Sequence, residues 1–243
     1  MRPADSPFIQ KTRALGRDRN SEFGASAYRL CKGVGLEFGA VNCPFDVDAE
    51  VMYLDQVPEP VLLERHKNDP NVTDVIPLTF VAPVMPYPFI ADRAFDFVIT
   101  SHVLEHLGNL GAALQEFARI VKPNGVIYCV VPHKDFCFDA HRPVTSLNHL
   151  ASEFFAGIER ISLDHYLDVH FCNVDVATVT REEAALLVAR VEHSYTEQLD
   201  FHVHTFTDVS FFDFVDRLSP IIGLSVEYKY WNGLHIHAAL RKL

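Results

Sequence analysis

The chain lacks several features that would assign it to a class at once. Its five cysteines include no Cys-x-x-Cys pair, and their odd number and wide spacing indicate reduced thiols rather than a disulfide framework. Positive charge is scarce: Lys and Arg number 21 against 32 Asp and Glu, so the formal net charge is −11. A general nucleic-acid-binding protein needs a basic face, and we therefore expect no nucleic-acid partner.

Long hydrophobic runs are also missing. No apolar stretch approaches the roughly 20 residues needed to cross a bilayer. The first residues include Arg and Lys but no apolar segment of the kind found in secretory signals. Together with the reduced thiols, these absences lead us to expect a cytoplasmic protein with no membrane partner.

The apolar residues that are present suffice for a large core. Hydrophobic residues make up 49% of the 243 positions, and 19 of them are Phe, which is enough for one well-buried α/β domain. We expect residues 1–243 to form a single domain. Within it, residues 1–20 are a polar lead-in with little expected order, and residues from about 157 to 200 are a helical insertion or cap.

One segment near the middle of the chain predicts the fold class. Residues 95–100 are apolar, β-branched and aromatic, which is typical of a strand buried on both faces of a sheet. From Val103 the apolar positions recur at helical spacing until the turn Lys122-Pro-Asn-Gly125, and residues 126–131 form a second buried strand. This order predicts a right-handed βαβ crossover of a doubly wound α/β protein.

This unit resembles the second half of the class I S-adenosylmethionine (SAM)-dependent methyltransferases. There, an Asp-containing strand leads into a segment like His102-Val-Leu-Glu-His-Leu107, and a Lys-Pro-Asn-Gly turn precedes the next strand. Near the C-terminus, Asn232-Gly233 between two alternating runs predicts an antiparallel hairpin, which this family places at the edge of its sheet. The resemblance implies a doubly wound, mostly parallel seven-stranded sheet with a C-terminal antiparallel hairpin.

The first predicted strand and its loop carry the first cofactor candidates. In the family this strand ends in an acid and a glycine-rich loop, because the backbone must approach SAM closely. Glu37 and Gly39 match the acid and the first glycine, whereas Val41 and Cys43 stand where later glycines would fall. The resemblance implies that Glu37, Gly39 and Ala40 contact the methionyl side of SAM; a plain strand-to-loop turn is the alternative.

The adenosine side is predicted from the second and third strands. Asp55 ends the second strand at the distance from the glycine loop where an acid binds both ribose hydroxyls, although it could instead only cap the helix at 58–67. Gln56 beside it could reach the adenosine. Phe80 could stack on the adenine ring or simply belong to the core.

Ser101 and His102 follow the central strand, at the edge where open α/β sheets bind ligands. In the family this segment lies against the methionine end of SAM, so the resemblance implies that both contact the cofactor. Ser101 could alternatively cap the following helix. Glu105 and His106 are expected to be structural.

Two His-containing segments are predicted to face the acceptor. Residues 133–149 directly follow a strand, and there we expect Asp135 and Arg142 to bind substrate. In the second segment, an extended backbone would place His202 and His204 on one face, with His204 as a further substrate-binding residue. A hydroxyl acceptor must lose its proton during methyl transfer, and His133 and His202 are the candidate bases.

The 13 His residues also raise the question of a metal. His202 and His204, completed by Asp135 or Asp139, could bind zinc or iron. However, the sequence has none of the tight Cys/His spacing of structural zinc sites. We therefore expect no metal and assign these His residues to proton transfer and substrate binding.

The leading hypothesis is a SAM-dependent methyltransferase that acts on an oxygen or nitrogen of a small-molecule acceptor, with a sugar or a natural product as candidates. One alternative is a catalytically inactive methyltransferase-like binding or scaffold subunit, suggested by the missing glycines. The other is a metal-dependent enzyme on the same fold. The 157–200 segment could also serve as a dimerisation arm, so a homodimer is one expectation.

Overall fold

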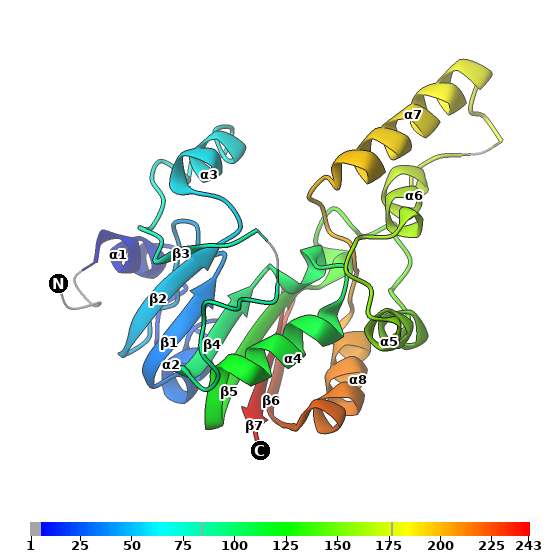
Figure 1. The fold of residues 1–243 in the computed structure, drawn as a ribbon. Helices are drawn as coiled ribbons and strands as arrows, with labels where there is room; N and C mark the ends of the chain where they lie inside the picture. The colour runs from blue at the N-terminus through cyan, green and yellow to red at the C-terminus, as the bar shows by residue number, and fades with distance from the viewer. Residues whose placement is uncertain (1–5, 84, 176) are drawn as a thin grey trace.

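The structure, a computed structural model, describes residues 6–83, 85–175 and 177–243 (Figure 1). Seven strands form one sheet in the order β3-β2-β1-β4-β5-β7-β6. This confirms the predicted seven-stranded α/β sheet. The strands are β1 (Gly33–Phe38), β2 (Ala49–Asp55), β3 (Phe80–Val81), β4 (Phe95–Ser101), β5 (Val121–Pro132), β6 (Leu224–Asn232) and β7 (His235–Lys242).

Strand direction determines where a ligand site can form. Strand β1 pairs in parallel with β2 on one side and with β4 on the other, and β4 pairs in parallel with β5. The strand order therefore reverses between β1 and β4, and a crevice opens at their carboxyl ends. Strand β7 is antiparallel to both β5 and β6, so the predicted C-terminal hairpin is confirmed. Its turn contains Gly233 at a φ of +79°.

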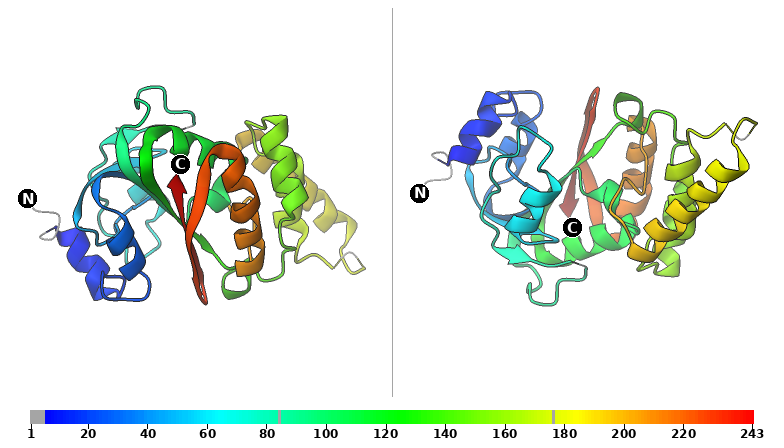
Figure 2. Two further views of the ribbon diagram at one scale, coloured as in Figure 1. Left: turned by 90° about the horizontal axis from the view of Figure 1, so that it is seen from below. Right: turned by 90° about the horizontal axis from the view of Figure 1, so that it is seen from above.

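Helices cover both faces of the sheet (Figures 1 and 2). The larger core joins the sheet to α4 and α8 through residues such as Leu36, Phe117 and Phe211, and the smaller core lies on the other face beneath α2. In β4, Phe97 and Ile99 enter the smaller core and Val98 enters the larger one, as a strand buried on both faces requires. The helices are α1 (Pro7–Ala14), α2 (Ala25–Leu30), α3 (Glu59–Arg65), α4 (Leu110–Ile120), α5 (Leu147–Ala156), α6 (Leu163–Phe171), α7 (Arg181–Glu197) and α8 (Asp208–Leu218).

The helix predicted from Val103 begins later than expected. A short 3₁₀ turn, η2 (Leu104–His106), follows β4, and α4 starts only at Leu110. The reason is local: Asn109 is extended, and its side-chain oxygen accepts a hydrogen bond from the N–H of Ala112, which fixes the helix start there. The prediction that Ser101 could cap this helix was therefore wrong.

Two other boundaries differ from the predictions. Strand β5 begins at Val121 rather than Val126, because the expected turn is taken up as an irregularity in the strand, with Asn124 at a φ of +64°. In the lead-in, α1 occupies residues 7–14, whereas we expected little order; residues 1–5 lie outside the described part.

The segment predicted as a helical insertion contains α6 and α7, which pack against each other and extend beyond the end of the sheet (Figures 1 and 2). Helix α7 begins with a capping box, in which Thr180 and Glu183 each satisfy the other's backbone N–H. Within the described residues, no helix combines the length and apolar character required to span a bilayer.

Candidate cofactor and active site

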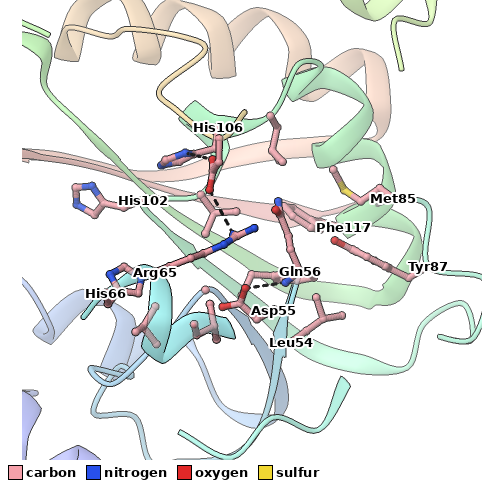
Figure 3. Close-up of a pocket in the computed structure, with 17 residues that line it drawn as sticks. Leu54, Asp55, Gln56, Arg65, His66, Met85, Tyr87, His102, His106 and Phe117 are labelled. Atoms are coloured by element: carbon pink, nitrogen blue, oxygen red, sulfur yellow. Dashed lines mark hydrogen bonds and ion pairs between the residues drawn. The ribbon is translucent and has the colours of Figure 1, made fainter. Parts of the chain in front are cut away.

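A cavity of about 260 Å³ opens at the carboxyl ends of β1, β2 and β4 (Figure 3). Its walls include Phe38, Leu54, Tyr87 and Phe117, which make much of its surface apolar and aromatic. Its polar groups come from the strand ends, from η2, from α3 and from a distant segment that contributes Asp200. A mostly apolar cavity with a few convergent polar groups is typical of a small-molecule site.

Asp55 and Gln56 form the polar wall at the end of β2. Oδ1 of Asp55 accepts a hydrogen bond of 2.7 Å from the backbone N–H of Gln56, and burial raises the pKa of Asp55 above its ordinary value. A half-buried carboxylate at a cavity wall suits ligand hydroxyl groups, which can donate to it. The alternative role in capping α3 is not observed, because Pro58 occupies the N-cap position of that helix.

The loop after β1 contains two residues with a left-handed backbone conformation. Gly39 has a φ of +65°, and a Cβ there would lie 2.7 Å from Cγ2 of Val103. Val41 has a φ of +48°, a left-handed conformation that β-branched residues rarely adopt. Both residues line the cavity. The valine that stands where a glycine was expected therefore still adopts a backbone conformation that favours glycine, with local strain of about 1–3 kcal/mol.

His102 projects from the end of β4 into the cavity wall. It too has a left-handed backbone, with a φ of +55°. Its Nε2 lies 2.9 Å from Nδ1 of His235, and its Nδ1 lies 3.4 Å from Oε1 of Glu105. Strained residues of this kind gather at functional sites, where the surrounding structure holds them in place.

A second imidazole in the cavity wall, that of His106, is paired with an acid. Nδ1 of His106 lies 2.7 Å from Oδ1 of Asp200, and Oδ2 of Asp200 lies 3.7 Å from Nη1 of Arg65 on α3 (Figure 3). Burial by itself lowers the pKa of His106, but the hydrogen bond with Asp200 and the charge of Glu105 outweigh it, so the pKa is raised. Asp200 is thus positioned to orient the ring and to stabilise its charged form.

Glu105 lies behind this wall, completely buried. Its Oε1 is 3.4 Å from His102 and 3.9 Å from both His106 and His202. Neither carboxylate oxygen has a hydrogen-bond partner within the described residues. The three imidazoles therefore lie around a single buried carboxylate.

The predicted base His202 sits one layer behind His106. Its ring meets that of His106 edge-to-face at 4.8 Å, and its Nδ1 lies 2.6 Å from Oδ2 of Asp139. Burial tends to raise the pKa of Asp139, but hydrogen bonds with His202 and Arg142 outweigh it and lower that pKa. Arg142 is itself buried and also binds Asp168 and the carbonyl oxygen of His202. It thus joins protein segments and does not line the cavity.

Of the predicted cofactor residues, the fold brings Gly39, Asp55, Gln56 and His102 together in the cavity wall. Glu37 is completely buried, where its carboxylate accepts from the N–H of Phe45, and burial raises its pKa to about 8. The residues that line the cavity do not include Glu37, Ala40, Phe80 or Ser101.

The predicted acceptor residues are dispersed. His133 stacks on Trp231 with ring centroids 5.2 Å apart, and Asp135 pairs with Lys134 at 2.7 Å. His202 and His204 do not share a face: His202 meets Asp139, whereas His204 meets Glu153. The prediction that placed both imidazoles together failed because residues 201–205 form no regular strand with a period of two.

Sequence reasoning missed His106 and Asp200. His106 stands in the same motif as His102, and its position next to the strand end was a usable signal. Asp200 is 94 positions further along the chain, so only the folded structure brings it there.

The residues of the cavity fit SAM. Asp55 would hold the ribose hydroxyls, and the aromatic wall would suit an adenine ring. His102 and His106 line the same cavity, apart from Asp55 and the aromatic residues.

Comparison with known proteins agrees with this fit. The family model described as a methyltransferase domain matches residues 30–129, the part from α2 into β5. No curated protein sequence matches the chain.

Among solved structures, a provisionally named Zn-dependent alcohol dehydrogenase from Rhodobacter sphaeroides is similar with a TM-score of 0.51 and 10% identity, over 98% of this chain and 99% of that one. SAM-dependent methyltransferases from Methanosarcina mazei (TM-score 0.46, 15% identity, 90% and 96% coverage) and Aquifex aeolicus (0.46, 12%, 97% and 98%) are also similar.

The first of these likenesses concerns the fold alone. The family match, the strand order and the cavity carry the assignment. Residues 30–129 match a methyltransferase domain, and the chain has the fold of the class I SAM-dependent methyltransferases, which implies SAM as the cofactor.

Proposed function

We propose that this methyltransferase acts on an oxygen or a nitrogen of a small-molecule acceptor, and that His106 takes the acceptor's proton. When bound, SAM supplies a methyl group on a positively charged sulfur, so the acceptor must present a nucleophilic atom. The observation that carries the proposal is the His106–Asp200 pair in the cavity wall, with its 2.7 Å contact and raised pKa.

The arrangement of His106 supports a base role. In the tautomer in which Nδ1–H donates to Asp200, Nε2 keeps the lone pair that accepts a proton. After transfer, the imidazolium is stabilised by Asp200 and by the buried Glu105. This pairing of a base with an orienting acid is the usual arrangement for general-base catalysis near neutral pH.

His202 then has a positioning role. It does not line the cavity, but its ring packs against His106 and is itself held by Asp139. Neither of the bases predicted from sequence, His133 and His202, is at the wall, and His106 replaces them in the proposal.

A small acceptor is favoured by the size of the cavity and by charge. About 260 Å³ lies just below the range for small-molecule sites, which is about 300–1,000 Å³. The net charge of −11 disfavours polyanionic acceptors and suits a neutral or cationic one. Sugars and natural products with hydroxyl or amino groups fit this description.

The test separates cofactor binding from chemistry. We expect Asp55→Ala to weaken the binding of SAM and S-adenosylhomocysteine at least about tenfold in calorimetric titration, because a buried hydrogen-bond acceptor for the ribose is lost. His106→Gln should keep cofactor affinity but lower kcat by about 10²–10⁴-fold, measured as S-adenosylhomocysteine release with a panel of hydroxylated and aminated acceptors.

The matched control is His193→Gln on the exposed face of α7, which should change neither quantity. Unchanged cofactor affinity in Asp55→Ala would refute the cavity as the SAM site. Unchanged turnover in His106→Gln would refute the base role alone.

We also propose that residues 1–243 form one cytoplasmic domain in which α6 and α7 cap the acceptor side. The five cysteines are unpaired, which fits a reducing compartment. If α6 and α7 instead form a dimerisation arm, light scattering on the purified protein will give the mass of a homodimer rather than 27.5 kDa.

A further inference from the structure

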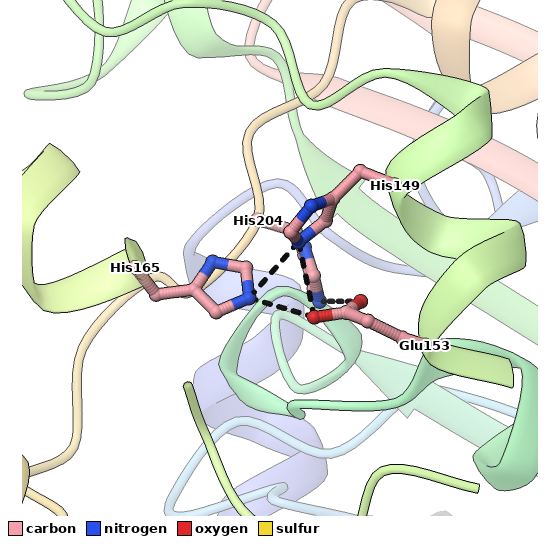
Figure 4. A group of neighbouring side chains, drawn as sticks. All are labelled: His149, Glu153, His165 and His204. Atoms are coloured by element: carbon pink, nitrogen blue, oxygen red, sulfur yellow. Dashed lines mark hydrogen bonds and ion pairs between the residues drawn. The ribbon is translucent and has the colours of Figure 1, made fainter. Parts of the chain in front are cut away.

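Four side chains from three separate segments meet away from the cavity: His149, Glu153, His165 and His204 (Figure 4). His149 and Glu153 are one turn apart on α5, His165 comes from α6, and His204 from the segment before α8. Glu153, His165 and His204 are buried, and the side chain of His149 is 35% exposed.

The distances between their polar atoms are those of a coordination sphere. Oε1 of Glu153 lies 2.7 Å from Nε2 of His165 and 3.0 Å from Nε2 of His149, and these two nitrogens are 3.2 Å apart. Nε2 of His204 lies 3.3 Å from Oε2 of Glu153. Four ligands about 2.0–2.1 Å from a tetrahedral zinc ion would be about 3.3 Å apart.

Hydrogen bonding alone leaves this cluster unsatisfied. Nδ1–H of His165 donates to the carbonyl oxygen of Val203 at 3.1 Å, which leaves its Nε2 with a lone pair aimed at an acceptor-only carboxylate. Within the described part of the chain, Nε2 of His204 and Oε2 of Glu153 have no hydrogen-bond partner. A single proton can serve one of these contacts at a time, whereas a cation at the centre serves all four.

The burial of His204 agrees with a ligand role. Its side chain is completely buried, and its Nε2 has no hydrogen-bond partner within the described residues. A buried polar atom of this kind needs another group to satisfy it. The hydrogen bond from His165 to Val203 is the outer contact that typically fixes a metal-binding tautomer.

We propose that His149, Glu153, His165 and His204 bind one divalent zinc ion. This goes beyond the proposed function and contradicts our expectation from the sequence that no metal is bound. Three imidazoles and one carboxylate in a tetrahedral arrangement are a donor set that zinc accepts, and four protein ligands make a closed site with a structural role.

The ion would join α5, α6 and the segment that leads to α8. Asp200 lies four residues before His204 in that segment, so the site would also fix the backbone that carries the partner of His106. The half-exposed His149 provides a route by which the ion can reach the buried ligands.

Two other groups of ligand-type residues compete less well. Both contain His202, whose Nδ1 is already paired with Asp139. Asp139 is in turn paired with the cation of Arg142 at 2.8 Å, and in the other group Glu105 is 3.9 Å from both imidazoles. The cation of Arg142 disfavours a metal ion in the group that contains Asp139, and the wider spacing disfavours one in the group that contains Glu105.

The test uses the full-length protein, stripped with a chelator and dialysed against Zn²⁺. We expect elemental analysis to find one zinc per chain, and Co²⁺ in its place to give the intense visible absorption of a tetrahedral site. His149→Ala and Glu153→Gln should weaken zinc affinity at least about tenfold. Zinc should raise the Tm of the wild-type protein but not of His149→Ala.

Two control variants make the test specific. His193→Ala removes an exposed imidazole on α7, and His202→Ala disrupts both competing groups; each should keep wild-type zinc affinity. Circular dichroism checks that each variant folds. If Glu153→Gln does not fold, the result for His149→Ala decides the test, since the side chain of His149 is half-exposed. The proposal is overturned if the folded wild-type protein retains no zinc, if His149→Ala binds it equally well, or if only His202→Ala loses it.

Discussion

At the residue scale, the charges around the cavity determine how the enzyme should respond to pH. His106 faces Asp200, Glu105 and His202, and its pKa is raised because the hydrogen bond with Asp200 and the charge of Glu105 outweigh burial. A general base works only in its neutral form, so the acidic limb of the kcat/KM profile should report this raised pKa.

Asp200→Asn removes the largest of the contributions that raise it. We expect the pKa of His106 to fall and the acidic limb of the profile to move to lower pH, with a reduced plateau because the ring is less well oriented. Initial rates measured across the pH range test this. Asp164→Asn, an exposed acid on α6, is the control, and an acidic limb that stays in place in Asp200→Asn would contradict the role of His106.

Glu37 is the residue whose burial should be most visible in stability. Burial raises its pKa in the folded protein to about 8, so its contribution to stability is full below its unfolded pKa of about 4.3 and is lost as the pH rises through about 8. Glu37→Gln keeps an oxygen that can accept from Phe45 but carries no charge. Relative to wild type, it should gain stability on the order of 4 kcal/mol between about pH 5 and about pH 9.

Urea unfolding at the two pH values measures this difference. Glu50→Gln on the exposed side of β2 should show no such gain. A Glu37→Gln protein whose stability follows wild type at both pH values would mean that the carboxylate is solvated.

At the element scale, α1 is held to the domain by one buried acid. Asp46 is 2% exposed and accepts hydrogen bonds from Arg13 and Arg19, while Oγ1 of Thr12 donates to the carbonyl oxygen of Pro44. The two arginines overcome the effect of burial and lower the pKa of Asp46. These contacts explain why a polar segment with weak periodicity is ordered.

Asp46→Asn should therefore loosen α1. We expect a loss of about 2 kcal/mol in the free energy of unfolding at neutral pH, since two charge-assisted contacts are weakened. Because the folded pKa is lowered, the difference should shrink as the pH falls below about 4. Faster amide exchange in residues 7–14 would locate the effect, and Asp48→Asn, which is exposed, should leave exchange there unchanged.

At the scale of the whole molecule, the reversal of strand order between β1 and β4 opens the cavity that we propose as the cofactor site. It brings Gly39, Asp55 and His102 to one edge, although they stand on three different strand ends. The chain after β5 then returns over the same edge and adds Asp200 to the wall. The residues that we propose for the cofactor thus come from the first half of the chain, and those that we propose for the acceptor come from the second half as well.

Features that depend on neighbouring residues were predictable from the sequence. Strand β4 and the hairpin at Asn232-Gly233 follow from residue patterns only a few positions long, because burial on both faces and a tight turn each demand particular side chains locally. The acid and glycine of the first loop, and Asp55 eighteen positions after Glu37, could be matched to the family for the same reason.

What only the tertiary structure decided are the contacts between distant segments. His106 acquires its acid from 94 positions away, and His204 joins His149 and His165 rather than its near neighbour His202. Among the four proposed zinc ligands, only His149 and Glu153 could have been related to each other from the sequence, because they are spaced by one helical turn. The sequence by itself determined the sheet and the cofactor edge, because periodicity and turn chemistry are local; the pairing of charges in the core depends on how the helices pack, which no local pattern encodes.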